Sequence, residues 1–228
     1  MTIADNFMMV RDRIVSAARH AGRNADTIQL IVVTKTVDLN RIREAVAAGA
    51  HILGENHVQE AKEKIEQLSA AASWHLIGKL QTNKVKYAVK LFDMIHSVDN
   101  IELAKEIDRH ALKIGKVQNI LIEVSIAGEA TKAGVTLEGV SALVSDAATL
   151  KNISIKGLMT VPPFLDDPEK VRPYFRTLRE LATNLAKKHI ANISMQELSM
   201  GMSGDFEVAI EEGATLVRIG TAIFGERQ

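Results

Sequence analysis

The feature that most constrains the fold of this 228-residue chain is a regular alternation of short apolar runs with longer amphipathic stretches. Eight apolar runs cover residues 28–36, 51–56, 73–78, 94–99, 118–126, 153–161, 195–200 and 216–224. Amphipathic stretches between them include residues 41–49, 58–71, 83–92, 100–115 and 171–189. Short runs rich in Val, Ile and Leu are typical of buried strands, whereas longer stretches with apolar residues at helical spacing predict helices. The alternation therefore predicts βαβ units and a parallel sheet.

Eight such units in 228 residues predict an α/β protein, a compact single (β/α)8 TIM barrel. An open doubly wound sheet is the rival architecture, and periodicity alone does not exclude it. All four prolines lie between residues 162 and 173, and no linker rich in Pro, Gly or Ser divides the chain. We therefore predict a single domain over residues 1–228.

The first 24 residues predict an extra N-terminal helix packed on the barrel. Apolar side chains recur at helical spacing at Ile3, Phe7, Val10, Ile14 and Ala17. The segment carries acidic residues and no secretory apolar region, so it is not typical of a signal peptide.

The overall composition limits the kinds of partner. The chain has 28 basic and 28 acidic residues, which gives no electrostatic reason to bind nucleic acid or an anionic membrane. No apolar run approaches the roughly 20 residues that span a bilayer. The absence of cysteine excludes disulfides and thiolate metal sites and fits a reducing compartment, and the histidines lack metal-binding spacing. We expect a cytoplasmic monomer without a metal site.

The stretch from residue 198 to 226 contains two turns of small and polar residues. The first, residues 199–204, precedes a predicted helix, and the second, residues 218–221, follows the last apolar segment. Helix starts favour anions, and glycine lets a phosphate approach the backbone. In a barrel these turns follow strands seven and eight, where phosphate is often held. We expect a phosphate cradle there, with candidate residues Ser199, Gly201, Ser203, Gly220 and Thr221.

Lys35 ends the first apolar run, in the sequence VVTKT. In a closed barrel the first strand adjoins the eighth, so Lys35 would lie near the phosphate cradle. A lysine amine in a dry pocket can form a Schiff base with an aldehyde, and an amine beside a phosphate site suggests pyridoxal 5'-phosphate (PLP). The alternative is a solvated lysine where a strand leaves the core, which is the commoner reading of an isolated lysine.

Three other polar residues each leave two interpretations open. Arg218 lies inside the apolar sequence LVRIG, and a buried guanidinium needs a partner: a carboxylate of the chain, or the phosphate or ring nitrogen of a ligand. Asn56 could contact a ligand ring, or it could cap a helix that starts near residue 57. Glu123 could face the barrel interior or the outside.

Several segments together resemble the pyridoxal phosphate homeostasis protein family, which is related to the N-terminal barrel of alanine racemases. They are VTKT, LGENHVQE, WHLIGKLQTNK, IHSVD, LIEVSI followed by KAG, GLMTV, and LSMGMSGDFEVAIEEGATLVRIGTAIFG. These segments run from about residue 28 to 225, and the last is highly specific. One departure is Val37-Asp38, where many family members have Lys-Pro after the lysine.

The resemblance implies a fold-type III PLP barrel with PLP held as an internal aldimine on Lys35. It implies that Arg218 approaches the pyridine nitrogen and that Asn56, in the GEN motif, contacts the cofactor ring. It assigns phosphate binding to the segments that contain Ser199, Gly201, Ser203, Gly220 and Thr221.

The resemblance also implies a role in intracellular PLP (vitamin B6) and amino-acid homeostasis without a catalytic residue. Racemisation needs a base on each face of the substrate, and alanine racemases take one from a tyrosine of an added β-domain. This sequence ends at Gln228, soon after the eighth apolar run, and its tyrosines, Tyr87 and Tyr174, lie in helical or loop contexts. PLP-dependent apo-enzymes are the expected recipients of PLP. The alternative is a small fold-type III amino-acid racemase.

Overall fold

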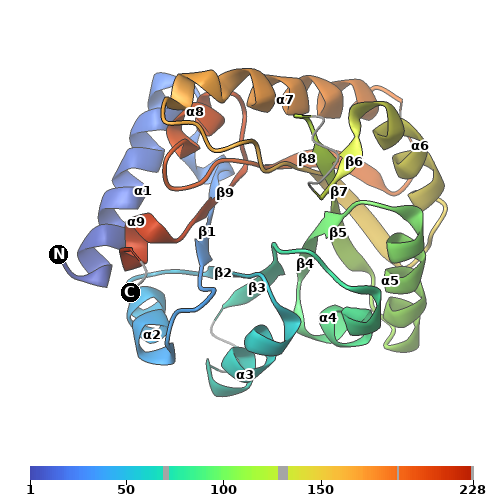
Figure 1. Ribbon diagram of the computed structural model, residues 1–228, viewed down its shortest axis with the longest axis horizontal. Coiled ribbons are helices and arrows are strands. Elements are labelled where there is room, and N and C mark those ends of the chain that lie inside the picture. The colour runs from blue at the N-terminus through green and yellow to red at the C-terminus, as the bar shows by residue number, and fades with distance from the viewer. Residues whose placement is uncertain (69–71, 128–132, 189, 227–228) are drawn as a thin grey trace.

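The computed structural model describes residues 1–68, 72–127, 133–188 and 190–226. Within these residues, eight parallel strands form a barrel with helices around its outside (Figure 1). The strands are β1 (Gln29–Val33), β2 (Ile52–Glu55), β3 (Ser73–Leu76), β4 (Met94–Val98), β5 (Gln118–Ser125), β7 (Ile153–Met159), β8 (Ile193–Ser199) and β9 (Leu216–Ile219). A short strand, β6 (Val135–Thr136), pairs with the end of β5.

The strand order is β4-β3-β2-β1-β9-β8-β7-β5, and β4 also pairs with β5, so the sheet is closed. The pairing of the first and last barrel strands, with Ile31 opposite Arg218, completes the barrel at the chain ends. Closure confirms the (β/α)8 barrel over an open doubly wound sheet. All the strands point the same way, so their carboxyl ends meet at one face of the molecule.

Helices follow the strands and cover the barrel. They are α2 (Leu39–Ala47), α3 (Val58–Leu68), α4 (Val85–Leu91), α5 (Ile101–Lys113), α6 (Leu137–Ala147), α7 (Arg172–Ala186), α8 (Phe206–Glu211) and α9 (Thr221–Phe224). Short 3-10 turns cover Ala25–Thr27, Thr82–Lys84 and Pro168–Lys170. Side-chain caps define several helix starts: Asp38 accepts from two backbone N–H groups of α2, and Asn100 accepts from one of α5.

The predicted N-terminal helix is α1 (Ile3–His20), which begins with a capping box between Thr2 and Asp5. Its apolar stripe is buried, and the helix lies against α8 and α9 (Figure 1). Just after the helix, Arg23 donates hydrogen bonds to the carbonyl oxygens of Ile210 and Ala214. These contacts join the start of the chain to its last βα units.

The barrel interior has its own apolar layer, separate from the larger core between strands and helices. It consists of Ile31, Leu121, Met159 and Leu216, with Ile52, Ile77 and Met94 packed against it. These side chains come from strands on opposite sides of the barrel, so they fill its centre.

The structure differs from prediction at the last apolar run. The apolar run at residues 216–224 predicts a single strand. In the structure the strand ends at Ile219, and Thr221–Phe224 form the helix α9. Ile223 and Phe224 are buried there, and Asn6 of α1 donates a hydrogen bond to the Ile223 carbonyl. A short apolar run does not separate strand from buried helix, so only packing against α1 made the distinction.

Parts of some predicted segments, namely residues 69–71, Lys132 of the KAG segment and His189, lie outside the described residues. Among the helices that the structure describes, none has the length and apolar content to cross a membrane.

Candidate functional site

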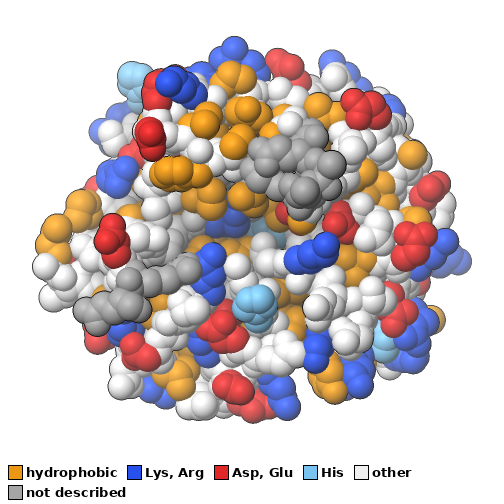
Figure 2. All heavy atoms as spheres, in the orientation of Figure 1, with side chains coloured by type: hydrophobic (Ala, Val, Ile, Leu, Met, Phe, Trp, Pro, Cys, Tyr) orange, Lys and Arg blue, Asp and Glu red, His pale blue; other side chains and the backbone are white. Residues whose placement is uncertain are grey.

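A cavity of about 850 Å³ opens at the carboxyl ends of the barrel strands. This volume falls in the range of roughly 300–1,000 Å³ that is usual for small-molecule sites. The space-filling view of this face is hollowed near its centre (Figure 2). The lining residues are Val33, Lys35, Thr36, Val37, Arg41, Asn56, Ile77, Val161, Met202, Ser203, Arg218, Gly220, Thr221, Phe224, Gly225 and Glu226.

The structure brings most of the candidate residues together in this cavity. Those that line it are Lys35, Asn56, Ser203, Arg218, Gly220 and Thr221. The other two, Ser199 and Gly201, are buried and lie next to Arg218, with which both form hydrogen bonds. Closure of the barrel is what joins a lysine at position 35 to residues beyond position 200.

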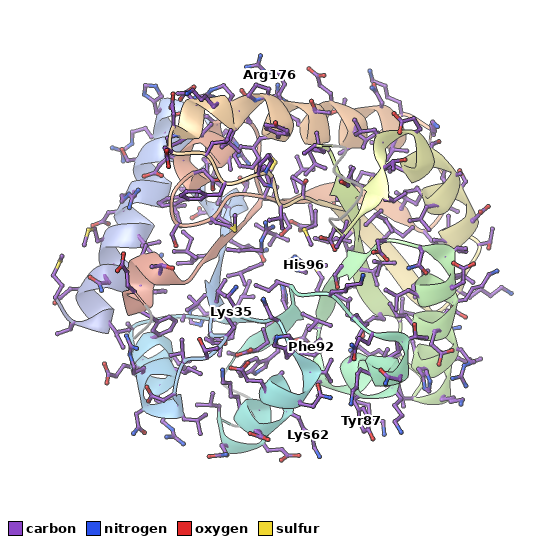
Figure 3. The ribbon with its side chains drawn as sticks, viewed as in Figure 1. Lys35, Lys62, Tyr87, Phe92, His96 and Arg176 are labelled. Carbon is purple, nitrogen blue, oxygen red and sulfur yellow. The ribbon has the colours of Figure 1, made fainter. Side chains whose placement is uncertain are left out.

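Lys35 lies on the connection from β1 to α2 and is half-buried at the cavity wall. Its neighbour across the barrel seam is β9, which carries Arg218. Figure 3 shows Lys35 near the middle of the carboxyl-end face. The first and last barrel strands are therefore adjacent, as predicted.

Arg218 is 4% exposed, and both ends of its guanidinium have partners in the barrel. Its Nη1 donates to Ser199 Oγ at 2.5 Å, and its Nη2 donates to the Thr160 carbonyl oxygen at 2.9 Å. Its backbone N–H donates to the Gly201 carbonyl at 3.0 Å. Burial lowers the pKa of Arg218 to about 10, so the side chain stays cationic at neutral pH. The guanidinium is thus a fixed positive charge at the cavity wall.

Two histidines extend this arrangement across the barrel. His96 Nδ1 lies 2.9 Å from Ser199 Oγ, and His96 Nε2 lies 3.1 Å from His75 Nδ1. Burial lowers the pKa of His75 to about 4 and that of His96 well below its ordinary value, so both rings are neutral at pH 7. His96 lies close to the barrel axis in Figure 3. We name Arg218, Ser199, His96 and His75 the interior polar chain.

The histidine spacing in the sequence bears only on metal binding and does not predict the interior polar chain. The available signal was their position inside otherwise apolar strands, in SWHL and MIHSV. Within the described parts of the structure, no group of three or more His, Cys, Asp or Glu side chains is placed to hold a metal ion.

The two turns that were predicted to bind phosphate contact each other. The Arg218 backbone N–H donates to the Gly201 carbonyl at 3.0 Å, and the Ala222 backbone N–H, in α9, donates to Ser203 Oγ at 3.3 Å, so the loop after β8 is tied to β9 and α9. A serine hydroxyl that accepts one hydrogen bond still has its own proton to donate. The helix between the turns, α8, is only six residues long, and the Met202 N–H already donates to Asp205 Oδ1 at 2.6 Å. The side-chain hydroxyls are therefore the better-supported donors.

Glycines allow the close backbone approach that shapes this wall. A Cβ on Gly220 would lie 3.2 Å from the Val33 carbonyl oxygen, and a Cβ on Gly78 would lie 2.5 Å from that of Asn56. Asn56 lies on the connection from β2 to α3 and lines the cavity. The helix it was expected to cap begins at Val58.

Glu123 is buried on β5, two residues after Leu121 of the interior layer, so both share the inward face. Burial, helped by Asp99 and opposed by Arg218 and Lys79, raises the pKa of Glu123 to about 7. The interior orientation is the correct one of the two alternatives.

Comparison with known proteins gives a consistent result. The family model described as "Alanine racemase, N-terminal domain" matches residues 9–228. The pyridoxal phosphate homeostasis protein of Aquifex aeolicus (strain VF5) is 48% identical over 229 residues, which covers 100% of each chain. That of Escherichia coli (strain K12) is 37% identical over 230 residues, 99% of this chain and 97% of the relative. The chain belongs to the pyridoxal phosphate homeostasis protein family.

Solved structures support the family membership and the fold. The PipY protein of Synechococcus elongatus PCC7942, solved with PLP bound, superposes with a TM-score of 0.87 at 35% identity over 98% of this chain and 100% of PipY. Alanine racemase of Clostridium difficile 630 has a TM-score of 0.75 at 15% identity, and the match covers 98% of this chain but 57% of the racemase. The racemase comparison shows the shared barrel alone.

Proposed function

We propose that this member of the pyridoxal phosphate homeostasis family binds PLP in the cavity at the carboxyl ends of the barrel, with Lys35 carrying the cofactor covalently through its aldehyde. The observation that carries the proposal is that the Lys35 amine, the hydroxyls of Ser203 and Thr221 and the buried guanidinium of Arg218 line one cavity of suitable size. The relatives' name and the PLP bound to PipY support this choice of ligand.

The residues of the cavity fit the chemistry of PLP. Lys35 supplies the primary amine, and Ser203 and Thr221 supply hydroxyl donors for the phosphate beside the close backbone approach at Gly220. Arg218 supplies a guanidinium that keeps its proton at neutral pH. Such a donor suits an unprotonated ring nitrogen, which accepts a hydrogen bond. The buried residues Ser199 and Gly201 hold Arg218 and the loop after β8 in place.

The same proposal assigns Asn56 to contact with the cofactor ring from the β2 side. When bound, PLP can act as an electron sink for amino acids, and a proton held on its ring nitrogen strengthens that role. A guanidinium at that nitrogen would keep the ring neutral. The site is therefore suited to holding PLP while restraining its reactivity.

We propose further that the chain acts as a PLP carrier and regulator in the cytoplasm, as a monomeric single domain over residues 1–228, without catalysis of its own. The relatives' name as homeostasis proteins supports this. The two tyrosines lie on outer helices, Tyr87 on α4 and Tyr174 on α7 (Figure 3 labels Tyr87). Recipients would be PLP-dependent apo-enzymes, which take PLP from the open face of the barrel.

Absorption spectroscopy tests the binding proposal. Purified protein mixed with PLP should show the visible band of a lysine-bound PLP at one equivalent, and Lys35→Ala should remove it. Lys90→Ala, an exposed lysine on α4, is the control and should keep the band. Persistence of the band in Lys35→Ala would refute the assignment of Lys35.

The alternative function is a small amino-acid racemase, since this chain shares the N-terminal barrel of alanine racemases. It predicts exchange of the α-proton of an amino acid for deuterium in the presence of the PLP-loaded protein. We expect no exchange above that of free PLP across the common amino acids. Clear turnover with any of them would replace the carrier proposal with the racemase.

A further inference from the structure

A buried charged cluster lies behind the segment that carries Lys35. Glu55, at the end of β2, is 0% exposed, and Lys64 of α3 is 7% exposed. Glu55 Oε1 accepts from Lys64 Nζ at 2.8 Å and from Thr34 Oγ1 at 2.6 Å. Thr34 is the residue directly before Lys35, so the cluster reaches the site from one side.

Lys64 uses all of its hydrogen-bonding capacity within this cluster. Its Nζ donates to the Thr34 carbonyl at 2.6 Å, to Glu55 Oε1 at 2.8 Å and to Glu60 Oε1 at 2.7 Å. An ammonium group has three N–H donors, so three acceptors satisfy it. The geometry fixes one position for the Thr34 carbonyl.

Glu60 connects the cluster to the other side of Lys35. Its Oε1 accepts from the backbone N–H of Thr36 at 2.6 Å as well as from Lys64. Thr36 has φ of 62°, a left-handed conformation that is unfavourable for a β-branched residue. Such a conformation persists only where the surrounding contacts determine it. The Glu60 carboxylate is the contact that holds the Thr36 N–H in this orientation.

We propose that Glu55, Glu60 and Lys64 form a positioning cluster that fixes the backbone on both sides of Lys35 and so sets the direction in which its amine enters the cavity. The cluster forms hydrogen bonds with the carbonyl and hydroxyl of Thr34 and with the backbone N–H of Thr36. Lys35 is therefore the middle residue of a three-residue segment that is held by hydrogen bonds at each end. The inference rests on the proposed role of Lys35 in PLP binding.

A role in stability alone does not account for this arrangement. Replacing a buried ion pair with apolar residues is often neutral or stabilising, so such a pair is weak evidence for a stability role. Here Lys64 donates to the backbone carbonyl of Thr34, and Glu60 accepts from the backbone N–H of Thr36, the residue in a strained conformation. Preorganisation of that segment is the effect that these contacts produce.

The experiment compares two substitutions of Glu60 in the full-length protein. Glu60→Ala removes the acceptor of the Thr36 N–H, whereas Glu60→Gln keeps a carbonyl oxygen at the same place. In the protein without PLP, hydrogen exchange of the Thr36 amide, measured by NMR, should be at least about tenfold faster in Glu60→Ala and close to wild type in Glu60→Gln. This readout does not depend on cofactor binding.

The second readout is the affinity for PLP, followed by the visible band. Glu60→Ala should raise the dissociation constant about tenfold, equivalent to about 1.4 kcal/mol, with Glu60→Gln again close to wild type. Lys64→Met should have at least as large an effect. Lys62→Met, on the exposed face of the same helix, is the matched control and should have none, since its ion pair with Glu66 is 3.7 Å long and solvated (Figure 3 labels Lys62).

The outcomes separate this inference from the proposed function. Unchanged Thr36 exchange in Glu60→Ala overturns the inference, and so does faster exchange with unchanged PLP affinity. Equal losses in Glu60→Ala and Glu60→Gln also overturn it, because the restored acceptor would then be without effect. A failure of the proposed function gives a different result: the Lys35→Ala variant would then keep the visible band.

Discussion

Arg218 on β9 donates a hydrogen bond of 2.5 Å to the hydroxyl of Ser199 on β8, inside the barrel. The same hydroxyl lies 2.9 Å from His96, which continues the interior polar chain to His75 on β3. One small side chain thus links the cationic wall of the cavity to two neutral rings on the opposite strands. Its replacement should affect both stability and the site.

Ser199→Ala should lower the free energy of unfolding by about 1–3 kcal/mol, because Arg218 and His96 each lose a buried hydrogen-bond partner. Urea unfolding followed by circular dichroism measures the change. Ser141→Ala, whose hydroxyl contacts Lys188 on the surface, should stay within about 0.5 kcal/mol of wild type. Equal effects of the two substitutions would contradict a structural role for the interior polar chain.

Arg218→Lys should raise the PLP dissociation constant about tenfold and shift the visible absorption maximum. Lysine keeps the positive charge but lacks the planar fork that reaches Ser199 and the Thr160 carbonyl together. Titration of the variant with PLP, monitored in the visible range, gives both quantities. An unchanged spectrum and affinity would show that charge alone matters at this position.

Gly201→Ala and Gly204→Ala form a matched pair in the turn after β8. Gly201 has φ of 90°, and a Cβ there would lie 2.6 Å from the Cβ of Ala209, so alanine should destabilise the fold by at least about 1 kcal/mol. A Cβ on Gly204 meets nothing within 4 Å, so that substitution should be neutral within about 0.5 kcal/mol. Thermal unfolding of both variants distinguishes them, and similar midpoints would argue against the described turn.

Acid should destabilise the protein through His75 and His96. Burial depresses the pKa of His75 from 6.5 to about 4 and that of His96 further, so the unfolded chain binds protons in this window that the folded chain does not. Stability is therefore retained above pH 6.5 and falls as the pH drops toward 4, by at most about 1.4 kcal/mol per pH unit for each histidine.

The His75→Gln/His96→Gln variant checks this sign. Urea unfolding at pH 7, 6 and 5 should show a shallower loss of stability toward acid than in wild type, because glutamine does not titrate. A slope as steep as that of the wild type would assign the acid sensitivity to other groups.

Much of the barrel follows from local pattern. The central ILIEV of β5 is apolar except for Glu123, as is typical of a strand covered on both faces, and the apolar stripe of α1 predicts both its helix and its buried face. The turns that contain Gly201 and Gly220 can be predicted from the sequence, because glycine and small polar residues directly after an apolar run are typical of turns. The candidate residues Lys35 and Arg218 could also be picked out, since charge at the end of, or within, an apolar run is unusual.

Other features depend on contacts between residues far apart in the chain. Closure through β4–β5 and β1–β9 pairing decided between a barrel and an open sheet and brought Lys35 to the seam with β9. His75 lies within hydrogen-bond distance of His96, and the Glu60 carboxylate accepts from the Thr36 backbone N–H. No spacing in the sequence specifies these partners.

By itself the sequence determined most of the strand and helix segments and which polar residues interrupt them, because hydrophobic period and turn chemistry are local properties; the exception is Thr221–Phe224, which packing made a helix. Only the tertiary structure decided which of those polar residues meet. Closing the sheet sets every distance across the barrel at once, and the burial that follows selects a hydrogen-bond partner for each enclosed charge and ring.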